Sequence, residues 1–188
     1  MRGRRVRHSA ALHQAVLDDD HERLTSLLEN GADPDQIGED GAGALHLAAF
    51  SGNPAHVRSL LEAGADPDLR HTVSGAAALN QSVLNRNEEI FHLLLEAGAD
   101  PDVADLNGNT ALHTAARTNK GWALLTLLEA GADPLAETVG RTFQHYYWGY
   151  NPAILNDRAR AERAQLIEWL EAHDMPVDPR ADQFRQGR

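Results

Sequence analysis

The sequence has no cysteine, few aromatic residues and almost no lysine. The absence of cysteine excludes disulfide bonds, thiolate metal sites and a cysteine nucleophile, and it fits a reducing compartment. Lys120 is the only lysine among 17 basic residues, a bias typical of a GC-rich, bacterial genome. Aromatic residues make up 5% of the chain while alanine and leucine are abundant, which favours closely packed helices over a β-sandwich.

The chain also lacks a long apolar run and an excess of positive charge. No stretch approaches the roughly 20 apolar residues that span a bilayer, so we expect no membrane segment and a cytoplasmic protein. The arginines of residues 1–8 resemble the start of a signal peptide, but the segment AALHQAVLDDD that follows has polar breaks, which argues against one. The net charge is −11, which disfavours binding to nucleic acid.

One phrase recurs four times along the chain. It reads LLENGADPD at 27–35, LLEAGADPD at 60–68 and 94–102, and LLEAGADPL at 127–135. A second phrase keeps the same spacing, as ALHQAV, ALHLAA, ALNQSV and ALHTAA beginning at residues 11, 44, 78 and 111. A catalytic motif is needed once, so phrases repeated every 33 or 34 residues indicate a repeat solenoid.

Each unit predicts a short helix rich in small residues, a polar break, a longer leucine-rich helix and a stop. A glycine ends the second helix, because it adopts the left-handed cap conformation at little cost, and a proline three residues later prevents continuation. The stop glycines are Gly31, Gly64, Gly98 and Gly131. The paired leucines cannot be buried within one unit, so the units must stack on one another.

These units resemble the ankyrin repeat family, whose signature is Thr-Pro-Leu-His-x-Ala. The closest match is GNTALHTAA at 108–116, with Ala111 in place of proline. The units at 41–49 and 75–83 are looser, and Asn80 takes the histidine position in the second of them. The resemblance implies an all-α repeat solenoid of about five stacked helix-turn-helix ankyrin repeats, joined by β-hairpin-like loops and closed by atypical capping repeats.

We place a single ankyrin repeat domain at residues 9–176, between a flexible basic tail at 1–8 and a C-terminal tail at 177–188. The predicted repeats are 9–37, 38–70, 71–104, 105–136 and 137–176. His71 is an extra residue between the second and third units, and the step to the last unit is one residue short. The last unit also loses the stop glycine, since AHDMP replaces AGADP, as expected of a terminal repeat.

Histidines and aspartates invite a chemical interpretation. Four of the ten histidines take the histidine position of the repeat, where the resemblance implies a hydrogen bond within the same repeat: His13, His46, His113 and His145. The other six lack the spacing of metal ligands. The aspartates of the GADP turns are interpreted as turn residues, since two carboxylates per layer do not supply the about six to eight oxygens of a calcium site. We predict no metal, no cofactor and no catalytic residue.

Five of the ten aromatic residues lie close together: Phe143, Tyr146, Tyr147, Trp148 and Tyr150. One interpretation is a cap, in which large side chains cover the exposed end of the stack. The other is a binding hot spot, because tyrosine and tryptophan concentrate interface energy, with Tyr150 facing outward. A related alternative is an enzyme or small-ligand site formed by His145, Tyr146, Tyr150 and the linker at 151–161.

In the ankyrin family, partners bind the concave face formed by the hairpin tips and the first helices. The matching positions here define a candidate surface: Leu17, Asp18, Glu39, Asp40, Phe50, Ser51, Val73, Ser74, Leu84, Asn85, Leu106, Asn107, Asn109, Arg117, Thr138, Arg141 and Tyr150. Phe50, Leu84 and Leu106 have no place on a purely solvated face. An acidic end would favour a partner with a basic surface, although such charge also occurs on solvated faces. It consists of Asp18, Asp19, Asp20, Glu39 and Asp40.

We therefore expect a monomeric, non-catalytic scaffold that binds another protein. A narrower expectation is an inhibitor or regulator of an enzyme or toxin encoded nearby. Self-association through the end caps is a further alternative.

Overall fold

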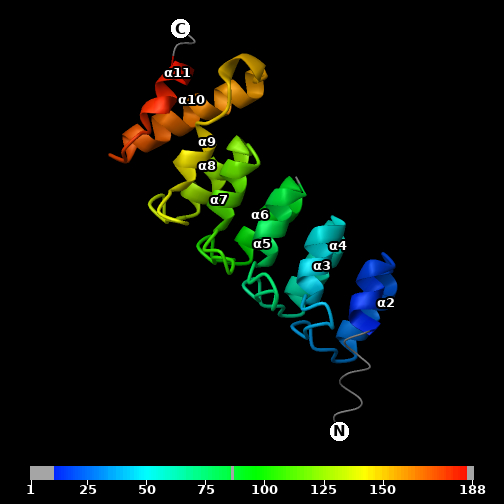
Figure 1. Cartoon of the computed structure of the whole chain (residues 1–188). Helices are drawn as coiled ribbons and strands as arrows, with labels where there is room; N and C mark the ends of the chain where they lie inside the picture. The colour runs from blue at the N-terminus through cyan, green and yellow to red at the C-terminus, as the bar shows by residue number, and fades with distance from the viewer. Residues whose placement is uncertain (1–10, 86, 186–188) are drawn as a thin grey trace.

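The chain forms a row of stacked helix pairs in the computed structural model, which describes residues 11–85 and 87–185 (Figure 1). The basic tail predicted at 1–8 lies outside these residues. The first helix covers residues 11–17. The others are α2 (His21–Glu29), α3 (Ala44–Ser51), α4 (Pro54–Glu62), α5 (Ala78–Leu84), α6 (Glu88–Glu96), α7 (Ala111–Arg117), α8 (Gly121–Glu129), α9 (Phe143–Tyr147), α10 (Asp157–Ala172) and α11 (Asp182–Arg185), with 3-10 turns η1 (Pro152–Ile154) and η2 (Pro179–Ala181).

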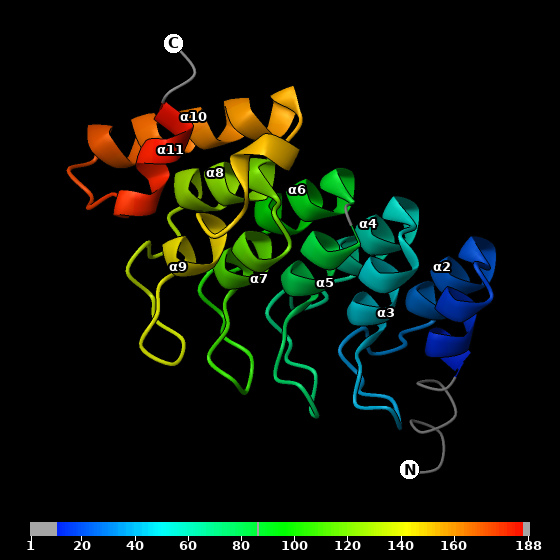
Figure 2. The ribbon, with the colours of Figure 1, turned by 45° about the horizontal axis from the view of Figure 1, so that its top comes forward.

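The helices form two layers. The first helices of successive units pack in sequence, α3 on α5, α5 on α7 and α7 on α9, and the second helices do the same, α2 on α4 and α4 on α6. The connecting loops all project on one side of the stack (Figure 2). The described residues contain no β-strand, only two isolated bridges that mark hairpins, Ile37 with Gly43 and Thr138 with Arg141. The predicted all-α repeat solenoid is confirmed.

The predicted helix stops are present in each internal unit. After α6, Gly98 has φ of 87° and donates its N–H to Leu95, while Ala99 donates to Leu94 at 3.0 Å. This pair of hydrogen bonds is the Schellman arrangement, which satisfies the last carbonyls of the helix. The last unit forms it without glycine: Asp174 takes a φ of 54°, and Met175 donates to Leu170 at 2.8 Å.

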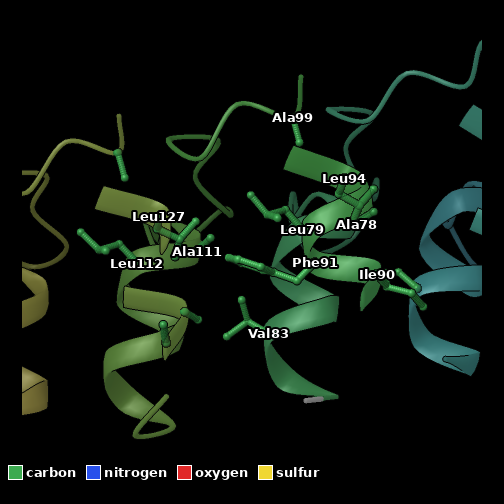
Figure 3. Packing of buried hydrophobic residues seen from close by; sticks show 14 of the residues in the cluster. Ala78, Leu79, Val83, Ile90, Phe91, Leu94, Ala99, Ala111, Leu112 and Leu127 are labelled. Atoms are coloured by element: carbon green, nitrogen blue, oxygen red, sulfur yellow. The ribbon is translucent and has the colours of Figure 1, made fainter. Parts of the chain in front are cut away.

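The core runs between the two layers and from repeat to repeat. Figure 3 shows small and large side chains alternating in it, such as Ala78, Leu79 and Phe91 beside Ala111. Phe91 is buried and meets Trp122 of the next repeat edge to face, with ring centroids 5.1 Å apart. Because alanines line the contacts between first helices, neighbouring backbones approach closely, which explains the low aromatic content of the internal units.

The GADP turns are linked to one another by aspartate side chains. The carboxylate of Asp35 accepts the backbone N–H of Asp66 at 2.8 Å, and Asp68 accepts that of Asp100 at 2.8 Å. Asp102 accepts that of Asp133 at 2.9 Å, and the series ends because Leu135 takes the next position. These aspartates were predicted to be turn residues. In the folded chain they also hold each turn to the next one.

The histidine position joins neighbouring repeats. His46 accepts the N–H of Gly43 through Nδ1, at 3.2 Å, and its Nε2 lies 3.0 Å from the carbonyl oxygen of Ala76 in the following hairpin. The prediction of a bond within the same repeat therefore covers only half of this arrangement. His145 is exposed, unlike the other three, because no further hairpin follows to cover it.

The C-terminal end is closed by α10, which packs against α8 (Figure 2). Arg163 of α10 is fully buried, and its guanidinium lies 4.2 Å from the ring centre of Tyr147. It donates to the Asn119 side chain at 2.7 Å and to the Tyr147 carbonyl at 3.2 Å. A tail was expected from residue 177, but α11 packs on α10 there, η2 packs on α11, and Ala181 is buried. The aromatic ring of Phe184 explains this packing, because it lies against the ring of Trp148.

Candidate protein-binding surface

Most members of the candidate surface are exposed. Exposed members are Leu17, Asp18, Glu39, Asp40, Phe50, Ser51, Val73, Ser74, Leu84, Asn85, Leu106, Asn107, Arg117 and Arg141. Asn109 and Tyr150 are half-buried, and Thr138 is buried. The exposed members lie on the loops and on the ends of the first helices, which form one side of the stack (Figure 2). These side chains are therefore accessible to a partner.

Several polar members already take part in the fold. The Asn85 side chain donates to the Phe50 carbonyl at 2.8 Å and so joins the ends of α5 and α3. The Asn109 side chain donates to Asp105 at 3.1 Å within one loop. Burial alone would raise the pKa of Asp105, but hydrogen bonds from Asn109 and Asn107 lower it below the ordinary value. These polar side chains brace the loops, which reduces their availability to a partner.

Thr138 does not present its side chain to solvent. Its hydroxyl donates to the Asn107 carbonyl of the preceding loop at 2.8 Å, and the residue is 3% exposed. The adjacent Val139 is instead 89% exposed and stands at the tip of the last hairpin. Sequence analysis missed Val139, although its position 33 residues after Leu106 would have identified it.

The apolar members form two groups of largely exposed side chains. Leu17, Phe50 and Leu84 end successive first helices, and Phe50 is 65% exposed. Val73, Leu106 and Val139 occupy successive loop tips, where each is at least 70% exposed. Large apolar side chains repeated at equivalent positions make an apolar surface that water solvates poorly. We name these six residues the apolar rows.

The aromatic cluster divides between core and surface. Phe143, Tyr147 and Trp148 are fully buried, which fits the cap interpretation, and Tyr146 is half-buried. Burial raises the pKa of Tyr147 far above its ordinary value. Tyr150 is half-buried as well, and its hydroxyl donates to the Arg117 carbonyl at 2.9 Å. The expectation that Tyr150 faces outward is therefore met only in part.

A family model described as ankyrin repeats (3 copies) matches the chain at residues 12–105 and 78–138. These matches together cover more than half of the sequence. The chain belongs to the ankyrin repeat family. No curated protein matches the chain at a significant level.

Ankyrin repeats typically serve as protein-protein interaction modules, and the charges of this ankyrin chain differ between the two ends of its candidate surface. Asp18, Glu39 and Asp40 are exposed at the N-terminal end. Arg117 and Arg141 are exposed toward the C-terminal end, and the guanidinium of Arg117 lies 5.8 Å from the ring centre of Tyr146. The surface therefore carries acidic side chains at its N-terminal end and basic side chains toward its C-terminal end, while the apolar rows run along its length.

The residues suggested for an enzyme or small-ligand site are His145, Tyr146, Tyr150 and the linker at 151–161. His145 is exposed and meets the Tyr146 ring edge to face at 5.5 Å, while the Tyr150 hydroxyl is bound to backbone. Across the described ankyrin repeats, no group of three or more His, Asp or Glu side chains is placed to hold a metal ion. None of the helices in the described part of the chain has the length and apolarity needed to cross a bilayer.

Proposed function

We propose that this ankyrin repeat protein is a non-catalytic scaffold that binds another protein through the candidate surface. The observation that carries the proposal is the exposure of the apolar rows at equivalent positions of successive repeats. These six side chains are largely exposed in the free protein, and their burial by a partner would remove apolar area from water. A preordered stack loses little conformational freedom on binding, so most of that gain is retained.

The partner that fits best is a single protein covering about 800 Å² of this surface, with a basic region facing Asp18, Glu39 and Asp40. We propose that the partner is an enzyme or toxin encoded nearby and that binding inhibits or regulates it. In this proposal the protein acts as a monomer and without a cofactor. It does not bind nucleic acid, because its net charge is −11. The lack of cysteine and the preference for arginine support a bacterial cytoplasm as its place of action.

A co-purification experiment tests the proposal. The tagged protein is expressed at native level, and proteins bound to it are compared with those bound to a Phe50→Ser, Leu84→Ser, Leu106→Ser variant. The matched control is Leu135→Ser, which removes an exposed leucine from a GADP turn outside the apolar rows. The proposal expects one protein to be retained by the wild type and the control and lost by the triple variant, with all three melting temperatures similar. Equal retention by all three would overturn it.

A further inference from the structure

A cleft of about 470 Å³ lies at the acidic end of the candidate surface, between the first two repeats. One side is formed by Val16 and Leu17 at the end of the first helix and by Asp19 in the turn after it, and the other by residues 51–54, from the end of α3 to the start of α4. Leu17 and Ser51 also belong to the candidate surface, so the cleft opens beside it. Its walls combine apolar side chains with one carboxylate, the combination that suits a long side chain with a charged end.

Asp19 is the carboxylate of the cleft. Its Oδ1 accepts the Asn53 side-chain N–H at 2.6 Å, which fixes the carboxylate across the cleft, and the side chain remains 73% exposed. The two neighbouring aspartates are engaged in the fold. Asp18 accepts from Gln14 at 2.7 Å, and Asp20 caps α2 by accepting the N–H of Arg23 at 3.0 Å. Asp19 is therefore the member of this acidic run that is directed at the cleft.

A buried histidine, His56, lies behind Asp19. The His56 side chain is fully buried, and neither ring nitrogen has a hydrogen-bond partner among the described residues. Its Nε2 lies 3.8 Å from Asp19 Oδ1, and its ring stacks on that of His21 at 5.5 Å. His56 is not part of the cleft lining, but it lies directly behind the Asp19 carboxylate that is, and it makes no hydrogen bond that would turn this carboxylate away from the cleft.

The His56 ring does not neutralise Asp19. Burial lowers the pKa of His56, and the nearby His21 lowers it further, while Asp19 and Asp20 act in the opposite direction with the smaller effect. The imidazole is therefore uncharged at neutral pH, and the negative charge of Asp19 remains available to a ligand. The Asp19 carboxylate is held in place by Asn53 and is 73% exposed, so a cationic group can reach it and form a charge-assisted hydrogen bond.

We propose that the cleft takes a positively charged side chain, an arginine or a lysine, of the partner protein. The alkyl part of that side chain would lie against Leu17 and Pro54, and its charged end would meet Asp19. This inference rests on the proposed function, and it assigns the cleft as the place where the partner's basic region is recognised.

The test is a titration of the full-length protein, labelled with ¹⁵N, at pH 7.5 and low salt. The probe is N-acetyl-L-arginine methylamide, and its neutral isostere N-acetyl-L-citrulline methylamide is the matched ligand. The variant Asp19→Asn removes the charge but keeps an acceptor for Asn53, and asparagine tolerates the left-handed backbone that Asp19 adopts at φ of 57°. Glu137→Gln, an exposed acidic residue at the other end of the chain, controls for net charge.

The proposal expects saturable shifts of the amide signals of residues 51–53 and Asp19 with the arginine probe. Citrulline should bind about tenfold more weakly or worse, and so should arginine with the Asp19→Asn variant, since a charged hydrogen bond is lost. Glu137→Gln should bind as the wild type does. Equal shifts with both probes, or shifts spread over the acidic surface and unchanged in Asp19→Asn, would overturn the assignment. Because no partner is needed, such a failure would leave the co-purification test of the apolar rows unaffected.

Discussion

The Nε2 atom of His46 lies 3.0 Å from the carbonyl oxygen of Ala76, thirty residues further along the chain. The same ring accepts the N–H of Gly43 at the start of its own helix. His113 repeats the arrangement, with the Thr110 hydroxyl at 3.0 Å and the Arg141 carbonyl at 3.3 Å. One imidazole thus closes the start of a helix and holds the next loop in place. The stability of these two repeats therefore depends in part on the loop that follows each of them.

Replacing His46 by alanine should lower the free energy of unfolding by about 2 kcal/mol or more, because two buried groups lose their partner. His145→Ala is the matched control, since it occupies the same position but is exposed, and it should change stability by less than about 0.5 kcal/mol. Urea unfolding followed by circular dichroism measures both values. Similar losses in the two variants would mean that the bridge between repeats contributes nothing.

Stability should fall as the pH is lowered from 7.5 to 5.5. Burial lowers the pKa values of His13, His46, His56 and His113 in the folded chain. The unfolded chain therefore binds more protons below about pH 6.5, the ordinary pKa of histidine, and stability rises with pH across that window. Urea unfolding at several pH values tests this expectation. The free energy of unfolding should change less steeply with pH in the His56→Gln variant. A wild-type stability that is the same or higher at pH 5.5 would refute the account.

Gly98→Ala should cost about 1 kcal/mol of stability. A Cβ added at Gly98 meets no atom within 4 Å, so the cost arises only from the φ of 87°, and Gly98→Val should cost at least as much. Gly149→Ala provides the comparison, because φ of Gly149 is not positive and its added Cβ would make only an ordinary contact with Tyr146. Melting temperatures of the three variants test whether the positive φ of Gly98 is the source of the cost. An unchanged value for Gly98→Ala would contradict the cap assignment.

Val139→Asn should raise stability by about 0.5–1 kcal/mol. Val139 and Gly140 have φ of 53° and 66° between the paired residues Thr138 and Arg141, which is a two-residue turn that favours Asn-Gly. A β-branched residue in that conformation is strained. Val73→Asn, at another exposed loop tip without positive φ, should change stability little. Chemical denaturation of both variants distinguishes backbone strain from a general effect of removing an exposed valine.

The sequence allowed the helices and their stops to be predicted because their causes are local. Leucine spacing and the glycine of each GADP turn act within a few residues of chain, so both could be recognised four times over. The stacked order of the units then follows from the need to bury the leucines.

The features that could not be predicted depend on a neighbouring repeat. Whether His145 is buried is decided by the absence of a following hairpin. Whether Thr138 or Val139 faces solvent is decided by a hydrogen bond to Asn107, which lies one repeat earlier. Arg163 reads as a surface residue of a polar helix, yet its guanidinium packs against Tyr147 of the preceding helix. Most of the candidate surface was exposed as expected, since exposure follows from position within a unit.

The replacement of aspartate by Leu135 has a consequence for how such a chain can lengthen in evolution. A duplicated copy of residues 71–104 inserted within the array would offer Asp102 to its successor and receive Asp68 from its predecessor, so both junctions would be complementary. A copy appended behind Leu135 would find no carboxylate to accept the N–H of its first turn. Gene duplication can therefore expand this array from within, whereas growth at its C-terminal boundary also requires a substitution at position 135.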